Sequence, residues 1–282
     1  MRAPRIIYGT AWKKAATADL VAAAIAHGYR AIDTACQPKH YFESGVGAGI
    51  AATGVPRDQI FLQTKFTPLA GQDATQPLPY DPVAPLTEQV RQSCATSLGN
   101  LRTEYLDSVV VHSPLPSHAD NMQVWRALEG LVDEGRIRAI GLANIYSLPD
   151  LARIYAEARI KPAAVQNRFY AESGFDAGIR DFCLSHGITY QSFWTLSANP
   201  CLLRSPAVVR VAAERRGTPE QALFALVMSL GVTPLTGTCS PKHMAEDLAV
   251  LAWPPLDEAA IAAFRILVQP EPHAGKNAAK AS

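Results

Sequence analysis

Five apolar stretches of the sequence each end on one polar side chain. These five are a carboxylate, an amine, an imidazole and two amides: Asp33, Lys65, His112, Asn144 and Gln166. Strands of a parallel barrel bring their carboxyl ends together at one mouth, so the five groups would gather over an apolar core. Burying such a set is unfavourable unless its members pair. Any one of them could be a satisfied buried group, but five on one face favour an active site for acid–base chemistry.

The elements that must position these groups alternate along the chain. Short β-branched or apolar runs predict strands at residues 5–10, 30–34, 60–65, 106–112, 137–143, 163–166, 188–193 and 231–236. Longer patterns predict helices at residues 17–27, 86–98, 122–134, 148–158, 176–185, 219–229 and 241–251. Each interval between strands leaves room for a crossover helix, which predicts an α/β fold of eight parallel strands, the (β/α)8 TIM barrel. We expect one barrel domain over residues 1–268 and a flexible C-terminal tail over residues 269–282.

An open, doubly wound sheet is the alternative for such an alternating pattern. Its usual mark is a G-x-G-x-x-G loop directly after an early strand. The segment Gly9-Thr-Ala-Trp12 lacks the repeated glycines, and Gly45-Val-Gly47 lies inside a helical pattern. The sequence therefore favours the closed barrel.

Composition argues against several function classes. The 26 basic and 25 acidic residues give a net charge of +1, so charge indicates no nucleic-acid partner and no acidic membrane surface. The five cysteines are dispersed, as is typical of reduced thiols, and no apolar run is long enough for a signal peptide or a membrane span. We therefore expect a cytoplasmic protein. The histidines show no H-E-x-x-H spacing and no G-x-S-x-G occurs, so we expect neither a metal site nor a serine nucleophile.

Four segments together resemble the aldo-keto reductase superfamily. They are Gly28-Tyr-Arg-Ala-Ile-Asp33-Thr-Ala35, Gln63-Thr-Lys65, Leu106-Asp-Ser-Val-Val-Val-His112 and Gly135-Arg-Ile-Arg-Ala-Ile-Gly-Leu-Ala-Asn144. The likeness runs over nearly the whole chain, from Gly9 to about Leu251. It implies an oxidoreductase that uses a nicotinamide cofactor to reduce an aldehyde or ketone carbonyl of a small molecule to the alcohol.

The resemblance also implies a catalytic tetrad of Asp, Tyr, Lys and His. Asp33, Lys65 and His112 fall directly on the motifs. In the implied mechanism, Asp33 holds Lys65 in place, and the ammonium lowers the pKa of the tyrosine, which donates the proton. His112 positions the substrate oxygen.

The loop that should carry the tyrosine departs from the family spacing. The family places this residue five positions after the aspartate, where this chain has Pro38. Tyr41 lies further along the loop, whereas counting back from Glu43 puts His40 at the tyrosine position. We expect Tyr41 to be the general acid, with His40 as the alternative or as part of the substrate pocket. Trp12 and the Pro-rich loop at residues 73–85 are also expected to shape that pocket.

The resemblance assigns further residues to the cofactor. Asn144 and Gln166 would bind the nicotinamide carboxamide, and Phe193 would stack on the ring in place of the usual tyrosine, with neighbouring Trp194 a less favoured partner. The remaining cofactor candidates are Thr10, Thr236, Gly237, Thr238, Lys242, His243, Glu246 and Asp247. The arginine that clamps the phosphate in many relatives is His243 here. Lys242 or His243 could partly replace it, and the helix start near Ser240 could also attract the phosphate. NADP(H) is modestly favoured by analogy, with NAD(H) as the alternative.

Two other functions remain open on the sequence alone. The altered tyrosine loop would also suit a barrel that binds the nicotinamide cofactor for regulation without catalysis. A lyase that uses Lys65 to form a Schiff base would need a neutral lysine, desolvated rather than paired with Asp33.

Overall fold

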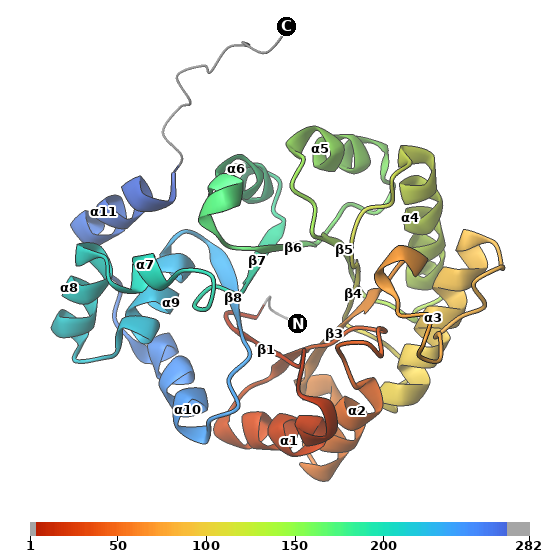
Figure 1. Ribbon diagram of the computed structural model, residues 1–282, viewed down its shortest axis with the longest axis horizontal. Coiled ribbons are helices and arrows are strands. Elements are labelled where there is room, and N and C mark those ends of the chain that lie inside the picture. Colours follow the sequence, from red (N-terminus) through yellow and green to blue (C-terminus); the bar gives the residue numbers. More distant parts are fainter. Residues whose placement is uncertain (1–3, 270–282) are drawn as a thin grey trace, which may run out of the picture.

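The structure, a computed structural model, describes residues 4–269 as a closed parallel barrel (Figure 1). Its strands are β1 (Ile7–Gly9), β2 (Ala31–Asp33), β3 (Phe61–Phe66), β4 (Ser108–Val111), β5 (Ile140–Ala143), β6 (Ala164–Arg168), β7 (Thr189–Phe193) and β8 (Val232–Thr236). They pair in sequence order, and β8 closes the ring against β1. The predicted (β/α)8 barrel is therefore confirmed. The expected C-terminal tail lies, from residue 270 on, outside the described residues.

Helices surround the strands on the outside of the ring. They are α1 (Thr17–His27), α2 (Glu43–Ala52), α3 (Leu86–Leu101), α4 (His118–Asp133), α5 (Leu148–Glu157), α6 (Ala177–Ser185), α7 (Pro200–Leu203), α8 (Pro206–Arg215), α9 (Pro219–Ser229), α10 (Pro241–Ala249) and α11 (Glu258–Val268). All seven predicted helices are present, and α1 and α9 have the predicted bounds. The predicted ranges did not include α7, α8 or α11, and α2 was predicted only as the helical pattern that contains Gly45 and Gly47.

The start of α9 shows how local sequence determines an element. The Thr218 hydroxyl accepts a hydrogen bond from the Gln221 backbone N–H, and the Gln221 side chain accepts one from the Thr218 N–H. This reciprocal capping box, with Pro219 in the first turn, satisfies donors that a helix start leaves free. The helix then buries its apolar side chains, including Phe224, against the barrel.

A polar cluster ties together the amino ends of three strands. The buried carboxylate of Asp107, just before β4, accepts hydrogen bonds from Arg57 at 2.8 Å and Arg138 at 3.0 Å, and from the Leu62 backbone N–H at 3.1 Å. Both guanidinium groups also stack on the ring of Tyr105. The cluster lies at the opposite end of β4 from His112, so it stabilises the barrel away from the predicted site.

The loop at residues 73–85 lies elsewhere than expected. Tyr80 is buried, packs against Phe66 and donates a hydrogen bond to the Thr67 carbonyl. Further along, the carbonyls of Pro82 and Ala84 accept hydrogen bonds from the Gln89 side chain in α3. These contacts fold the loop over α3, and it contributes no side chain to the large cavity described below. The expectation that this loop shapes the substrate pocket is wrong.

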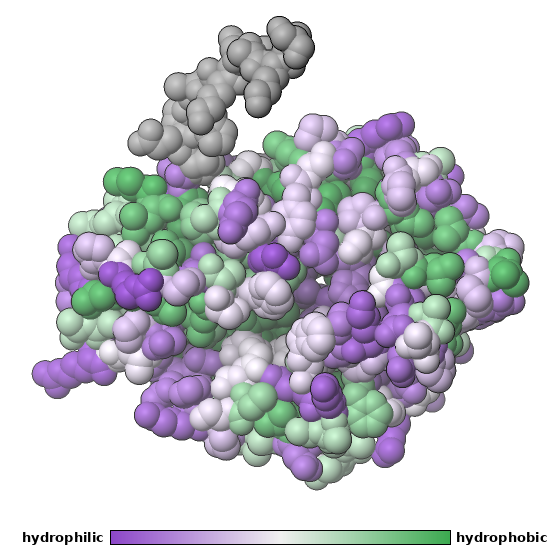
Figure 2. Space-filling model, viewed as in Figure 1, coloured by the Kyte–Doolittle hydropathy of each residue, from purple (hydrophilic) through white to green (hydrophobic). Residues whose placement is uncertain are grey.

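The outer surface carries no single dominant apolar area on the face in view. Hydrophobic side chains form separate patches among hydrophilic ones (Figure 2). Within residues 4–269, no helix has the length and apolar character needed to cross a membrane.

Candidate active site

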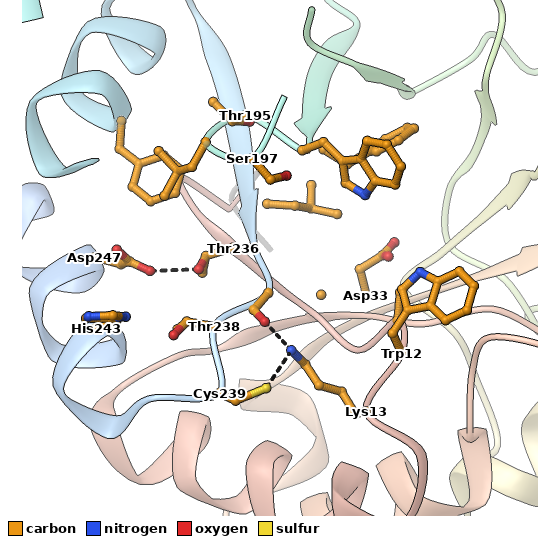
Figure 3. Close-up of a pocket in the computed structure, with 18 of the residues that line it drawn as sticks. Trp12, Lys13, Asp33, Thr195, Ser197, Thr236, Thr238, Cys239, His243 and Asp247 are labelled. Atoms are coloured by element: carbon orange, nitrogen blue, oxygen red, sulfur yellow. Dashed lines mark hydrogen bonds between the residues drawn. The ribbon is translucent and has the colours of Figure 1, made fainter. Parts of the chain in front are cut away.

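A cavity of about 840 Å³ opens at the carboxyl ends of the strands. Asp33, Tyr41 and His112 lie at one end, and the start of α10 lies at the other. Figure 3 shows this extent, with Trp12 and Asp33 on one side of Lys13 and with His243 and Asp247 on the other. Asp33, His112, Asn144 and Gln166 therefore line one long cavity, whereas Lys65 does not. Gln166 is not the strand end that was predicted, because β6 runs on to Arg168.

The floor beneath the cavity is a buried ion pair held by amides. Lys65 Nζ lies 2.5 Å from Asp33 Oδ2 and donates a second hydrogen bond to the Thr34 carbonyl at 2.8 Å. The other carboxylate oxygen of Asp33 accepts hydrogen bonds from the side chains of Gln63 and Gln166, at 2.8 and 2.9 Å. Both oxygens are thus satisfied, as a buried carboxylate requires. Burial lowers the pKa of Lys65, and the adjacent Asp33 carboxylate opposes that shift.

Tyr41 lies over this ion pair. Lys65 Nζ is 5.3 Å from the centre of the Tyr41 ring, and the ring meets His112 edge-on with centroids 6.0 Å apart. Within residues 4–269, the phenol hydroxyl has no hydrogen-bond partner, so it is available to a ligand in the cavity. The sequence predicted that Lys65 would lower the pKa of this phenol. Instead, burial and the Asp33 charge raise the pKa of Tyr41, so the phenol keeps its proton at neutral pH.

His40 has a different environment. Its ring packs against Trp12 at a tilt of 35° with centroids 3.8 Å apart, and the Trp12 backbone N–H donates to the His40 carbonyl at 2.7 Å. Burial lowers the pKa of His40, with the nearby Lys39 charge adding to the effect. The rings of His40 and Tyr41 both line the cavity, but only the Tyr41 ring lies against Lys65 and His112. Geometry therefore favours Tyr41 over His40 at the tetrad position and leaves His40 with Trp12 in the wall.

His112 is held by a residue that the sequence reading did not identify. The Thr67 hydroxyl lies 2.7 Å from His112 Nδ1. Burial, and then the charge of Lys65, lower the pKa of His112 to about 3, so the imidazole is neutral at ordinary pH. If the hydroxyl donates to Nδ1, the hydrogen of the ring stays on Nε2, which then acts as a donor.

The predicted carboxamide-binding amides lie beside this group. The Asn144 side-chain amide donates to the His112 carbonyl at 2.8 Å, which leaves one N–H unused. The Gln166 amide donates to Asp33 and to Gln191 Oε1, so its own oxygen remains as an acceptor. Phe193 also lines the cavity, and Trp194 packs edge-on against it with ring centroids 6.2 Å apart.

At the far end of the cavity, two side chains that can carry a positive charge, Lys242 and His243, lie among several carboxylates. Thr236, Gly237, Thr238, Lys242, His243, Glu246 and Asp247 all line it. Lys242 Nζ is 3.6 Å from Glu246, and Asp247 accepts a hydrogen bond from the Thr236 hydroxyl at 2.7 Å. Burial raises the pKa of Asp247 to about 6. Lys13 was not predicted; it is buried and donates to the Gly237 carbonyl.

Thr10 is the one predicted cofactor residue that does not line the cavity. It is fully buried, and its hydroxyl donates to the Asp33 carbonyl at 2.9 Å. Thr10 therefore supports the strand that carries Asp33 instead of facing a ligand.

Several residues of the site were not predicted from the sequence, although their spacing from predicted residues marks them. Side chains two positions apart on an extended strand share a face. Thr67 follows Lys65 by two positions, Gln63 precedes it by two, and Arg168 follows Gln166 by two. Gln191 likewise precedes Phe193 by two positions, but only the ring closure brings it to Gln63.

The sequence model of the Aldo/keto reductase family matches residues 5–205. The chain belongs to the aldo/keto reductase family. It is 30% identical over 235 residues to an aldo-keto reductase of Mycolicibacterium paratuberculosis, covering 83% of this chain and 75% of the relative. It is 29% identical to the glyoxal reductase of Bacillus subtilis, covering 81% and 75% of the two chains. A solved aldo/keto reductase from Brucella melitensis has a TM-score of 0.79 at 27% identity, covering 94% of this chain and 95% of the other.

The cavity of this aldo/keto reductase can be compared with the cofactor that the family generally uses. The family consists of oxidoreductases that act on carbonyl groups and generally use NAD(P)H. The donor set fits such a dinucleotide: amides and an aromatic face at the tetrad end, Lys13 in the middle, and Lys242 at the start of α10. A helix start and cations are suited to phosphate groups, and amides are suited to a carboxamide.

Proposed function

We propose that this aldo/keto reductase reduces the carbonyl of an aldehyde or ketone to an alcohol, with Tyr41 as general acid. The observation that carries the proposal is the position of the Tyr41 ring, over the Lys65–Asp33 ion pair and against His112, with its hydroxyl unpaired. When bound, NAD(P)H supplies the hydride to the carbonyl carbon. Asn144, Gln166 and Phe193 would hold the nicotinamide, and Lys13 and Lys242 would face the phosphates.

The chain's own groups handle the proton. His112 Nε2–H donates a hydrogen bond to the carbonyl oxygen and orients it toward Tyr41. The Tyr41 phenol, which burial keeps protonated, gives its proton to that oxygen as the alcohol forms. The Lys65 ammonium beneath the ring then stabilises the phenolate that remains.

The geometry gives less support to the lyase alternative. Lys65 is ion-paired and buried below the cavity, and it is not part of the cavity wall. A Schiff-base lysine needs a free amine that reaches the substrate. The reductase proposal uses Lys65 as it stands, charged and shielded.

For the cofactor, we keep NADP(H) as the favoured form and NAD(H) as the alternative. The lysine that faces the adenosine end is paired with Glu246, and Glu220 and Asp247 add negative charge to the same wall. We therefore expect only a small preference for the phosphorylated cofactor. Titration of the protein with NADPH and NADH, followed by tryptophan fluorescence, measures that preference directly.

The test of the function compares two neighbouring variants. Tyr41→Phe should lower kcat for methylglyoxal reduction by roughly 10²-fold or more while cofactor affinity is unchanged, because only the donated proton is lost. His40→Asn is the matched control and should retain kcat within about tenfold. Wild-type turnover by Tyr41→Phe, together with loss of turnover in His40→Asn, would assign the acid to His40. Tight cofactor binding without turnover on a broad carbonyl panel would favour the regulatory alternative.

A further inference from the structure

Arg168 places a positive charge in the cavity wall above the predicted reaction centre. It is the last residue of β6 and lines the cavity together with Gln166. Asn167 between them faces the other way, toward Asp176 and Ile145. Side chains at alternate positions share one face of a strand, so Arg168 points inward as Gln166 does, one layer nearer the mouth.

The strand register gives the height of this layer. Across β4, β5 and β6 the aligned residues are Val111, Leu142 and Val165. The next residue on β4 is His112 and the next on β6 is Gln166, so these two occupy the same position in the strand register. Arg168 is two residues beyond that level, which is about 7 Å along the strand. A substrate whose carbonyl contacts His112 could therefore place a second group beside Arg168.

Aromatic rings hold the guanidinium in place. Its central carbon lies 4.1 Å from the centre of the Trp194 ring and 5.0 Å from that of Tyr170. The Arg168 backbone N–H donates to the Tyr146 hydroxyl, which in turn donates to Asn144 at 3.3 Å. Stacking uses the faces of the guanidinium and leaves its N–H edges free for hydrogen bonding.

Within the described part of the chain, those N–H edges have no protein acceptor. Among residues 4–269, no carboxylate lies within 4.0 Å of Arg168, and its buried Nε has no hydrogen-bond partner. The two lysines that line the same cavity differ in this respect. Lys13 donates to the Gly237 carbonyl, and Lys242 lies 3.6 Å from Glu246. Arg168 thus combines a fixed position with an unmet need for an anionic acceptor.

We propose that Arg168 binds a carboxylate of the substrate, so that this reductase acts on carbonyl compounds that carry a carboxylate several bonds from the reacting carbonyl. This inference rests on the proposed carbonyl reduction. A planar guanidinium can donate two parallel hydrogen bonds to a carboxylate, which positions the substrate as well as attracting it. The separation of one strand layer between His112 and Arg168 favours semialdehydes or carboxyaryl aldehydes over compounds in which the two groups are adjacent.

The test uses a matched pair of aldehydes, 4-carboxybenzaldehyde and its methyl ester methyl 4-formylbenzoate. The wild-type protein should prefer the acid in kcat/KM, chiefly through KM. In Arg168→Met the ratio of kcat/KM for acid over ester should fall at least about tenfold. In Arg168→Lys the ratio should lie between those of wild type and Arg168→Met, because lysine keeps the charge but cannot donate two parallel hydrogen bonds. Arg126→Met on the outer face of α4 changes the net charge equally and should leave the ratio unaltered.

A binding measurement separates this inference from the proposed function. The alcohol product 4-(hydroxymethyl)benzoate and its methyl ester are titrated into wild-type and Arg168→Met protein by calorimetry, with no turnover required. Tighter binding of the acid by wild type, lost in the variant, supports the carboxylate site even if neither aldehyde is reduced. Turnover of both aldehydes with an acid-to-ester ratio that is the same in wild type and Arg168→Met would overturn the inference while leaving carbonyl reduction intact. Equal binding of acid and ester by both proteins would also overturn it.

Discussion

The Thr67 hydroxyl lies 2.7 Å from Nδ1 of His112, whose imidazole is kept neutral by burial and by the nearby Lys65 charge. Replacement of Thr67 by valine keeps the shape and removes this hydrogen bond. We expect kcat for carbonyl reduction to fall about tenfold with little change in cofactor affinity, because the ring loses its fixed tautomer. Thr67→Ser retains a hydroxyl and should recover most of the loss. Equal kcat for the valine and wild-type proteins would show that the hydroxyl does not position His112.

The buried ion pair of Lys65 and Asp33 leads to a second prediction. Lys65→Met should reduce kcat by roughly 10²-fold or more, because the phenolate of Tyr41 loses the charge that stabilises it. Cofactor affinity should stay within about tenfold, measured by fluorescence titration. The variant also leaves Asp33 buried without its cation, so its thermal unfolding must be followed as well.

A double variant separates chemistry from stability here. Lys65→Met combined with Asp33→Asn removes both charges and should recover much of the lost Tm while remaining inactive. Recovery of turnover in the double variant would contradict a direct role for the ammonium.

The pKa of Asp247 predicts how cofactor binding depends on pH. This carboxyl group has its pKa raised to about 6 and faces the adenosine end of the cavity. As pH falls from about 7.5 to about 5, the group takes up a proton and stops repelling phosphate, so NAD+ should bind about threefold to tenfold more tightly. Asp247→Asn should remove most of this dependence, and His243→Asn controls for the neighbouring imidazole. An unchanged slope in Asp247→Asn would contradict the assignment.

The cluster at the amino ends of the strands predicts a loss of stability without a loss of function. Asp107→Ala removes the acceptor of the Leu62 N–H and one acceptor from each of the two guanidinium groups. Both arginines are partly exposed to solvent, so we expect a cost of about 2–3 kcal/mol and a Tm lower by roughly 5 °C or more. Asp133→Ala removes an exposed ion pair with Arg159 and should change stability by less than about 1 kcal/mol. A loss of kcat in folded Asp107→Ala protein would mean that the two ends of the barrel are coupled.

Much of the fold could be predicted because its signals are local. The eight strands alternate with helices whose caps and apolar faces lie within a few residues of each other in the chain. The same kind of signal marks two helices that were not predicted: Ser205-Pro206 begins α8 as Thr218-Pro219 begins α9, and Asp257 caps α11. The path of the loop at residues 73–85 could not be predicted, because it depends on the burial of Tyr80 against Phe66 on another element.

For the site, the sequence by itself determined that Asp33, Lys65 and His112 stand at or next to strand ends, since each strand's apolar pattern and its polar residue are contiguous. Tertiary structure decided which loop residue joins them. The segment between β2 and α2 has no periodicity, and only its contacts place Tyr41 on Lys65 and His40 on Trp12. The sequence likewise could not predict that the guanidinium of Arg168 lacks an acceptor among the described residues. An unpaired charge is defined by what surrounds it in space, and those neighbours come from strands and loops distant in the chain.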